Sequence, residues 1–380
     1  MRYLCLIPVL STLLFSALPA QAAPVFDFGG YYKNLHTYTR SVYSEEDINA
    51  NLNRLRLTME AHNDPWQFYI AVDNEALIHD FGNTGDFQTI HNKEQDQAVN
   101  VDLDHASVDN DHLYLNHKIY RLYVKYYSPQ WQAAAGKQAV DWGNLRFYSP
   151  ADLFNPNGPL DLEYDERIGI DGVTFNYSPD GFKGVSLVAL PGDGAEDSSY
   201  GLKAYTQLGD FDTAFIAANR QEADIFGLTW DGYLQDAGFR GEVTHTTMDD
   251  NRQFARAAVG LDYTFDQKTY GLIEYFYNGG ADENNPLALL NSLRNSRDLL
   301  SLRKHLASLW WQYKFTPLII WDQFFICDLE GGSAAYNPEI NYNVRQNLDI
   351  GAGIQFYWGD NDTEFGDSEN VYYVQLKWHF

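Results

Sequence analysis

Cysteine, long apolar runs and basic residues are all scarce in this sequence. There are two cysteines among 380 residues, Cys5 and Cys327. Cys5 lies in a segment that we expect to be cleaved, and the single thiol that then remains cannot form an internal disulfide. After that segment, no stretch supplies the roughly 18 apolar residues that a membrane-spanning helix requires. The sequence therefore excludes a disulfide-stabilised scaffold and a bundle of membrane helices.

Positive charge is low, with 26 lysines and arginines against 52 aspartates and glutamates and a net charge of −26. A chain this acidic would be repelled by phosphate backbones, so we expect no nucleic-acid partner. The sequence also lacks a Gly-x-Ser-x-Gly elbow, a P-loop, a zinc-ligand pair and a Cys-x-x-Cys-His haem motif. We therefore expect neither an enzyme nor a resident cofactor.

The first 22 residues have the pattern of a cleavable signal peptide. Arg2 is followed by the apolar run 3–18 and by the small-residue site Ala20-Gln21-Ala22. Such a pattern predicts export, with cleavage before Ala23; an uncleaved N-terminal anchor is the alternative. We expect a signal peptide over 1–22 and a single domain over 23–380.

Aromatic residues are abundant, at 16%, which suits rings that border a membrane on both sides. Apolar and polar residues alternate over 54–61, 66–73, 120–126 and 349–358, with Tyr120 on the apolar face. In a dry core the polar partners would lack hydrogen bonds, but a water-filled lumen satisfies them. We expect the following side chains to face such a lumen: Arg54, Arg56, Glu60, Asp73, Arg121, Lys125, Arg240 and Glu242.

Turn-forming residues divide the chain into regular lengths. Tight turns are expected near 63–65, 128–131, 178–183, 208–211, 232–237, 265–268, 315–317 and 343–347. Longer connections alternate with them, near 40–47, 78–113, 143–167, 191–198, 220–224, 248–253, 279–305, 328–332 and 359–370. Eight turns and nine connections join eighteen strands, or sixteen if the weak strands around 184–231 are misread. The sequence therefore predicts an all-β fold, a transmembrane up-and-down antiparallel β-barrel wide enough for a channel.

The last strand carries the most specific pattern of the chain. Five residues share its apolar face, and the sequence stops at the last of them: Tyr372, Val374, Leu376, Trp378 and Phe380. This ending resembles the C-terminal signature of bacterial outer-membrane proteins. The resemblance implies insertion among outer-membrane lipids, with the barrel assembly machinery as a partner that reads the signature.

A second resemblance rests on a central run of motifs. These are Gly136-Lys137-Gln138, Asp141-Trp142-Gly143, Arg146-Phe147-Tyr148, Pro150, Asp152-Leu153-Phe154-Asn155-Pro156 and Gly172-Val173. Together with residues 347–366, they are similar to porin-like outer-membrane proteins whose biochemistry is mostly unassigned. Such proteins carry Arg where this chain has Lys137. The resemblance implies porin-like architecture and carries no substrate.

The central run also predicts a constriction. Residues 141–167 are too long for a tight turn, and their prolines and aromatic residues would be poorly used in a loop that waves in solvent. We expect the run to fold inward and narrow the channel; an outer loop packed on its neighbours is the alternative. Charge at the constriction would come from Asp141, Arg146, Asp152, Asp161, Glu163, Asp165, Glu166 and Arg167.

Two other segments suggest special structure. Asp102, Asp104, Asp109 and Asp111 offer oxygen ligands for Ca²⁺, although their spacing matches no known ion loop and a solvated acidic loop is the alternative. Residues 286–305 have a capping Asn285, an early proline and leucines on one side, which predict a basic helix. That helix would rest on the rim or fold into the lumen as a lid.

Taken together, these patterns predict an outer-membrane porin-like channel for passive or weakly selective diffusion of small polar solutes or ions. An acidic lumen would favour cations, unless the acids crowd the outer loops and merely face solvent. Two other functions stay open, a barrel that sheaths a partner protein such as a cytochrome, and an outer-membrane enzyme.

Overall fold

The computed structural model describes residues 23–42, 44–80, 104–156, 158–163, 167, 169–192, 194, 197–220, 223–281 and 301–380. Within these ranges the regular structure is entirely β. None of the described segments is a helix long and apolar enough to cross a membrane. Part of the predicted helix over 286–305 lies outside the described residues; of its described end, 301–304 are irregular and the next strand begins at His305.

Nineteen strands lie in the described ranges. They are β1 (Val25–Arg40), β2 (Asp47–Asn63), β3 (Trp66–His79), β4 (His105–Asn110), β5 (Leu113–Tyr127), β6 (Trp131–Gln138), β7 (Ile170–Tyr177), β8 (Gly184–Leu190), β9 (Ser199–Leu208), β10 (Phe211–Arg220), β11 (Ala223–Leu234), β12 (Ala237–Met248), β13 (Gln253–Thr264), β14 (Thr269–Asn278), β15 (His305–Thr316), β16 (Ile319–Asp328), β17 (Ala334–Arg345), β18 (Leu348–Trp358) and β19 (Val371–His379).

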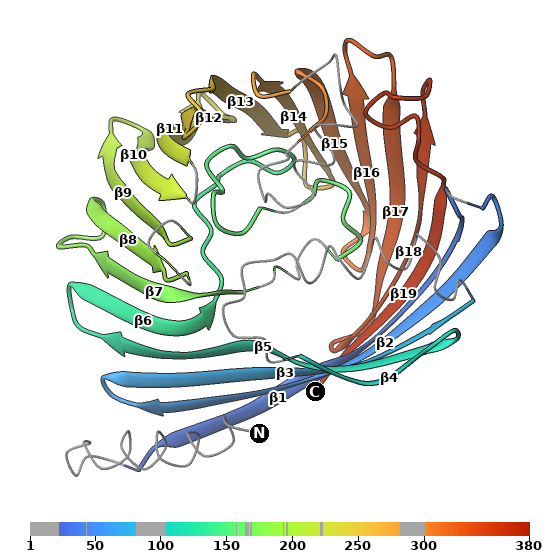
Figure 1. Cartoon of the computed structure of the whole chain (residues 1–380), viewed down its shortest axis with the longest axis horizontal. Helices are drawn as coiled ribbons and strands as arrows, with labels where there is room; N and C mark the ends of the chain where they lie inside the picture. Colours follow the sequence, from blue (N-terminus) through green and yellow to red (C-terminus); the bar gives the residue numbers. More distant parts are fainter. Residues whose placement is uncertain are drawn as a thin grey trace.

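Antiparallel pairing between chain neighbours closes the sheet into a ring (Figure 1). The first and last strands meet, with Tyr31 opposite His379, and Gly30 and Phe380 exchange two backbone hydrogen bonds. Strand β4 pairs with the first half of β5, whose second half pairs with β6. Because β3 pairs directly with β5, β4 stands beside the wall rather than in it. Among the described strands, 19 − 1 = 18 form the wall, which confirms the predicted eighteen-stranded barrel.

Connections between the strands follow the expected alternation. The eight predicted turns all separate successive strands, from 64–65 after β2 to 346–347 after β17. The connection predicted over 78–113 differs, because it contains β4. Its six residues lack the longer alternation that identified the other strands.

The two faces of the wall differ sharply in chemistry. Leu57, Ile273 and Val374 are 46%, 55% and 52% exposed on the outside, whereas Arg54 and Asp73 are buried on the inside. An apolar outer face is what a lipid environment requires, and polar inner groups find partners in one another.

The prediction that Tyr120 lies on the apolar outer face is wrong. A register shift sets Ala71 opposite Arg121 and Val72 opposite Ile119, so Tyr120 is the extra residue of a bulge in β5. Such a bulge turns the extra residue to the other side of the sheet. The Tyr120 ring therefore lies inside, 3.4 Å from the Arg56 guanidinium carbon.

Removing Phe380 should reduce assembly of the barrel. The truncated chain loses the two backbone hydrogen bonds to Gly30 and the exposed aromatic side chain that directly follows β19. We expect a several-fold smaller folded fraction, measured as the heat-modifiable band in outer-membrane extracts. Phe380→Tyr keeps both features and is the matched control. An undiminished folded fraction without residue 380 would contradict the expectation.

Candidate functional site

One long connection, between β6 and β7, turns into the barrel. We call residues 139–169 the inward segment; the structure describes them except 157, 164–166 and 168. In Figure 1 this segment lies within the ring of strands. Its side chains reach the inner faces of strands on both sides of the ring, through different kinds of contact.

Aromatic side chains from the two ends of the stretch 142–154 attach the segment to the inner face of β7–β11. Trp142 and Phe154, 4% and 2% exposed, meet edge to face with ring centroids 5.0 Å apart. They pack with Ile216 and Ile225 in one apolar cluster. The wall must lack a side chain here, because a Cβ on Gly201 would lie 2.6 Å from the Trp142 ring.

A second apolar cluster attaches the middle of the segment to β13–β17. Tyr148 stacks on Phe276 with ring centroids 4.9 Å apart, and Phe147 meets Phe324 edge to face. Leu145 joins them, together with wall residues that are almost fully buried. Burial of each large apolar side chain contributes about 1.5–3 kcal/mol. The two clusters therefore hold the segment firmly against one side of the barrel.

Two buried wall carboxylates bind the irregular backbone of the segment. Glu242 on β12 is 0% exposed and accepts hydrogen bonds from the backbone N–H groups of Asn144 and Ala151, at 2.6 and 2.8 Å, and from the Ser149 hydroxyl. Glu274 on β14 accepts the N–H groups of Arg146 and Phe147 at 2.8 and 2.9 Å. Backbone donors away from water need such partners, so these carboxylates determine where the segment can lie.

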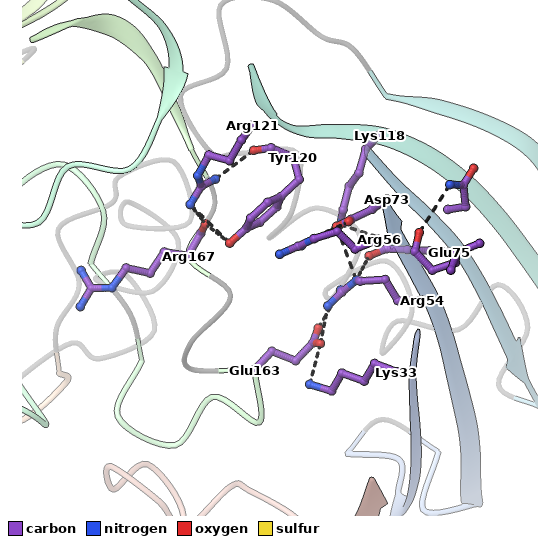
Figure 2. Close-up of polar contacts among 12 residues, drawn as sticks. Lys33, Arg54, Arg56, Asp73, Glu75, Lys118, Tyr120, Arg121, Glu163 and Arg167 are labelled. Atoms are coloured by element: carbon purple, nitrogen blue, oxygen red, sulfur yellow. Dashed lines mark hydrogen bonds and ion pairs between the residues drawn. The ribbon is translucent and has the colours of Figure 1, made fainter. Parts of the chain in front are cut away.

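On the opposite side of the barrel the segment is held by ion pairs (Figure 2). Glu163 accepts two hydrogen bonds from the Arg54 guanidinium, at 2.6 and 2.9 Å, and one from Lys33 at 3.0 Å. We call Lys33 and Arg54 the clamp. Arg54 Nε also donates to Glu75 at 2.5 Å, and Lys118 lies 3.0 Å from the same carboxylate. Strands β1, β2, β3 and β5 thus combine to hold one carboxylate of the segment.

The pKa of Glu163 reflects this clamp. Burial raises the pKa, but the charges of Arg54 and Lys33 outweigh burial and lower it to about 2. Glu163 is therefore ionised at every physiological pH.

Arg167 ties the end of the inward segment back on itself. Its side chain bonds Asp152 and lies 3.3 Å from Asp141, while its carbonyl oxygen accepts hydrogen bonds from Arg121 and from the Tyr120 hydroxyl (Figure 2). Burial raises the pKa of Asp152 to about 7, despite the opposing effect of Arg167. Asp152 therefore titrates close to neutral pH.

The remaining expected constriction residues take separate positions. Asp161 accepts a hydrogen bond from Gly158 N–H at 2.8 Å, and the Arg146 guanidinium carbon lies 5.2 Å from the centre of the Phe324 ring. Asp165 and Glu166 lie outside the described residues.

The other residues expected in the lumen form local pairs. Asp73 binds Arg56 through two hydrogen bonds of 2.6 Å, and Arg240 bonds Asp262. Glu60 bonds Gln67 and contacts His62. The Lys125 ammonium lies 5.5 Å from the rings of Tyr123 and Tyr127.

The calcium candidates stay a prediction. Asp102 lies outside the described residues, and Asp109 and Asp111 belong to β4 and its turn. Among the described side chains, no three His, Cys, Asp or Glu residues gather as a metal site would require.

Sequence reasoning missed several residues that hold the segment. Lys33, Glu75, Lys118 and Glu274 all lie on inward positions of strands, so strand alternation was the available signal. Alternation shows which face of the wall a residue occupies but does not show which residue it contacts. Lys33 and Glu163, for example, are 130 positions apart.

Comparisons place the fold among known barrels. No protein-family model and no curated protein sequence matches the chain. Among similar solved structures, Pseudomonas aeruginosa OccK8 (OprE) has a TM-score of 0.57 and 7% identity, covering 93% of this chain and 98% of its own. Acinetobacter baumannii OccAB3 has a TM-score of 0.55 and 13% identity, covering 93% and 99%. A triple mutant of the Rhodopseudomonas blastica porin has a TM-score of 0.50 and 12% identity, covering 94% and 100%. At such identities the likeness concerns the fold.

Glu242→Ala should release the inward segment while the wall persists. The substitution leaves three donors without their acceptor, at a cost of about 1–3 kcal/mol each where they stay buried. We expect faster hydrogen exchange at residues 144–151 and unchanged exchange in β1–β3. Glu330→Ala, which alters an exposed carboxylate outside the lumen contacts, is the control. Equal exchange rates in the two variants would argue against this anchoring role.

Docking of the inward segment should weaken as pH rises toward neutrality. The folded pKa of Asp152, about 7, exceeds its ordinary value of 3.8. Folding therefore favours the protonated form, and its stabilising effect is lost between about pH 4 and pH 7. We expect amide protection at residues 152–155, next to Asp152, to fall over this range, and Asp152→Asn to reduce the dependence there. The readout must be local, because burial also raises the pKa of Glu364, in another connection, to about 7. A pH profile that Asp152→Asn leaves unaltered would refute this assignment.

Proposed function

We propose that this chain is an outer-membrane channel through which small polar solutes diffuse past the inward segment. The observation that carries the proposal is the position of that segment, inside a ring with an apolar outer face and a charged inner face. Export by the N-terminal signal peptide and recognition of the Phe380 ending by the assembly machinery belong to the same proposal. The shared porin fold supports it without assigning a solute.

The route for solutes runs along β1, β2 and β5. The two apolar clusters occupy the inner face of β7–β17, whereas the described contacts of the segment with β1, β2 and β5 are polar. Polar contacts exchange with water more readily than packed aromatic rings do. Basic side chains line this side, namely Lys33, Arg54, Arg56, Lys118 and Arg121. With the neighbouring acids Asp73 and Glu75, they create a local field that orients polar solutes.

The two other functions have less support. A sheath needs room in the lumen for its partner, and here the inward segment is anchored within it. An outer-membrane enzyme needs an assembled acid–base pair, and His245 and Asp249, which are close in the sequence, occupy an exposed position of β12 and the turn that follows.

Purified protein should form discrete channels in planar bilayers, and Arg146→Ala/Arg167→Ala should change them. Removing two guanidinium groups from the segment reduces the local positive charge and frees its end from Asp152. We expect higher single-channel conductance and a reversal potential displaced toward cation preference, in a barrel that still resists heat in detergent. Arg252→Ala, at a 68% exposed side chain in a loop, is the control. Absence of channel currents with the unaltered protein would refute the channel function. Identical currents in the double variant and the unaltered protein would show that the segment does not affect permeation.

A further inference from the structure

We propose that Lys33 and Arg54 form a binding site for the carboxylate or phosphate group of a passing solute, and that Glu163 occupies this site until such an anion displaces it. This inference rests on the proposed channel function. In this proposal the ligand of the clamp is the anionic group of the solute, and Glu163 competes with that group for the same donors.

The clamp has the geometry of an oxyanion site. Arg54 presents two N–H groups to the two oxygens of one carboxylate, at 2.6 and 2.9 Å, and Lys33 adds a third donor at 3.0 Å. Planar bidentate donors of this kind recognise carboxylate and phosphate groups. A solute with either group would find the same three donors that Glu163 uses now.

The wall holds this site ready. The remaining guanidinium nitrogen of Arg54 is fixed by Glu75, and Glu75 is in turn held by Lys118 (Figure 2). Lys33, Arg54 and Glu75 lie on three adjacent paired strands, β1, β2 and β3. A donor set fixed by neighbouring side chains and rigid strands keeps its shape when one ligand replaces another.

The charge of the ion-pair network favours replacement of Glu163 by another anion over a clamp with no anion bound. The described ion-pair network contains four cations, Lys33, Arg54, Arg56 and Lys118, and two wall acids, Asp73 and Glu75. Without Glu163 the net charge is 4 − 2 = +2, and with it 4 − 3 = +1. Because the Lys33 and Arg54 side chains are only 5% and 4% exposed, leaving them without an anion is costly. Departure of Glu163 is therefore coupled to arrival of another anion.

Glu163 is the partner placed to leave. Its side chain is 26% exposed, whereas those of Lys33 and Arg54 are 5% and 4% exposed, so Glu163 is the most accessible member of the site. The described part of the limb that carries it, 158–163, adds one apolar side chain, Leu160, to the clusters, whereas 140–154 supplies eight. A hydrogen bond of 2.6 Å from the Gln355 side chain to the Leu160 carbonyl oxygen also holds the limb, so a shift of Glu163 beyond that point leaves the aromatic anchors in place. An anionic solute would both bind the clamp and widen the route.

The test compares anion binding in full-length Glu163→Gln and unaltered protein. Sodium acetate and inorganic phosphate are titrated separately onto a single channel in potassium chloride, and the concentration for half-maximal change in current is measured. A neutral amide competes less well than a carboxylate, so Glu163→Gln should bind at least one of the two anions about tenfold more tightly. The anion with the larger gain identifies the group that the clamp prefers. Glu330→Gln is the matched control and should bind as the unaltered protein does.

Arg54→Lys provides the second arm. It keeps the charge and removes the planar pair of donors, so the gain should disappear in Glu163→Gln/Arg54→Lys, provided that this barrel resists heat in detergent. Equal half-maximal concentrations in Glu163→Gln and the unaltered protein would overturn the proposal and leave Glu163 a structural tie. Conduction by the unaltered protein would still stand in that case, which separates this failure from failure of the channel itself.

Discussion

Irregular backbone inside a barrel must find hydrogen-bond partners away from bulk water, and Glu242 and Glu274 meet that requirement here. A regular strand satisfies its N–H groups through its neighbours, but none of the described residues of the inward segment belongs to a strand. The two carboxylates accept four of its backbone N–H groups, which fixes the segment near β12 and β14. The aromatic clusters, the clamp and the route past the segment all depend on this placement.

The segment is attached in two physically different ways. Packed aromatic rings on the β7–β17 side lose dispersion contacts as soon as they move, and nothing in water replaces those contacts. Ion pairs on the β1–β5 side exchange partners with little change in shape, because a different oxyanion meets the same donors. The segment is thus held by packing on one side of the barrel and by ion pairs, which the proposal treats as exchangeable, on the other.

Local patterns in the sequence were sufficient for the wall. Strand alternation and turn residues depend on neighbouring positions in the sequence, so they predicted β2, β3, β18 and all eight tight turns. The aromatic residues of 142–154 indicated an inward segment because they needed burial.

Contacts between distant residues could not be predicted from the sequence. Glu163 gives no sign in the sequence that its partners are Lys33 and Arg54. The bulge at Tyr120 was missed for a similar reason, since only the pairing with β3 reveals the extra residue. The net charge of −26 also gave no guide to this wall, where basic side chains gather.

The most direct test of the account measures the narrowest opening of the channel. Neutral polyethylene glycols of increasing size lower single-channel conductance as long as they enter the pore, so the size at which they cease to act reports its width. Replacing residues 143–167 by a short glycine and serine linker should raise that size limit in a barrel that still resists heat in detergent. An unchanged limit in such a folded variant would show that the inward segment does not narrow the route.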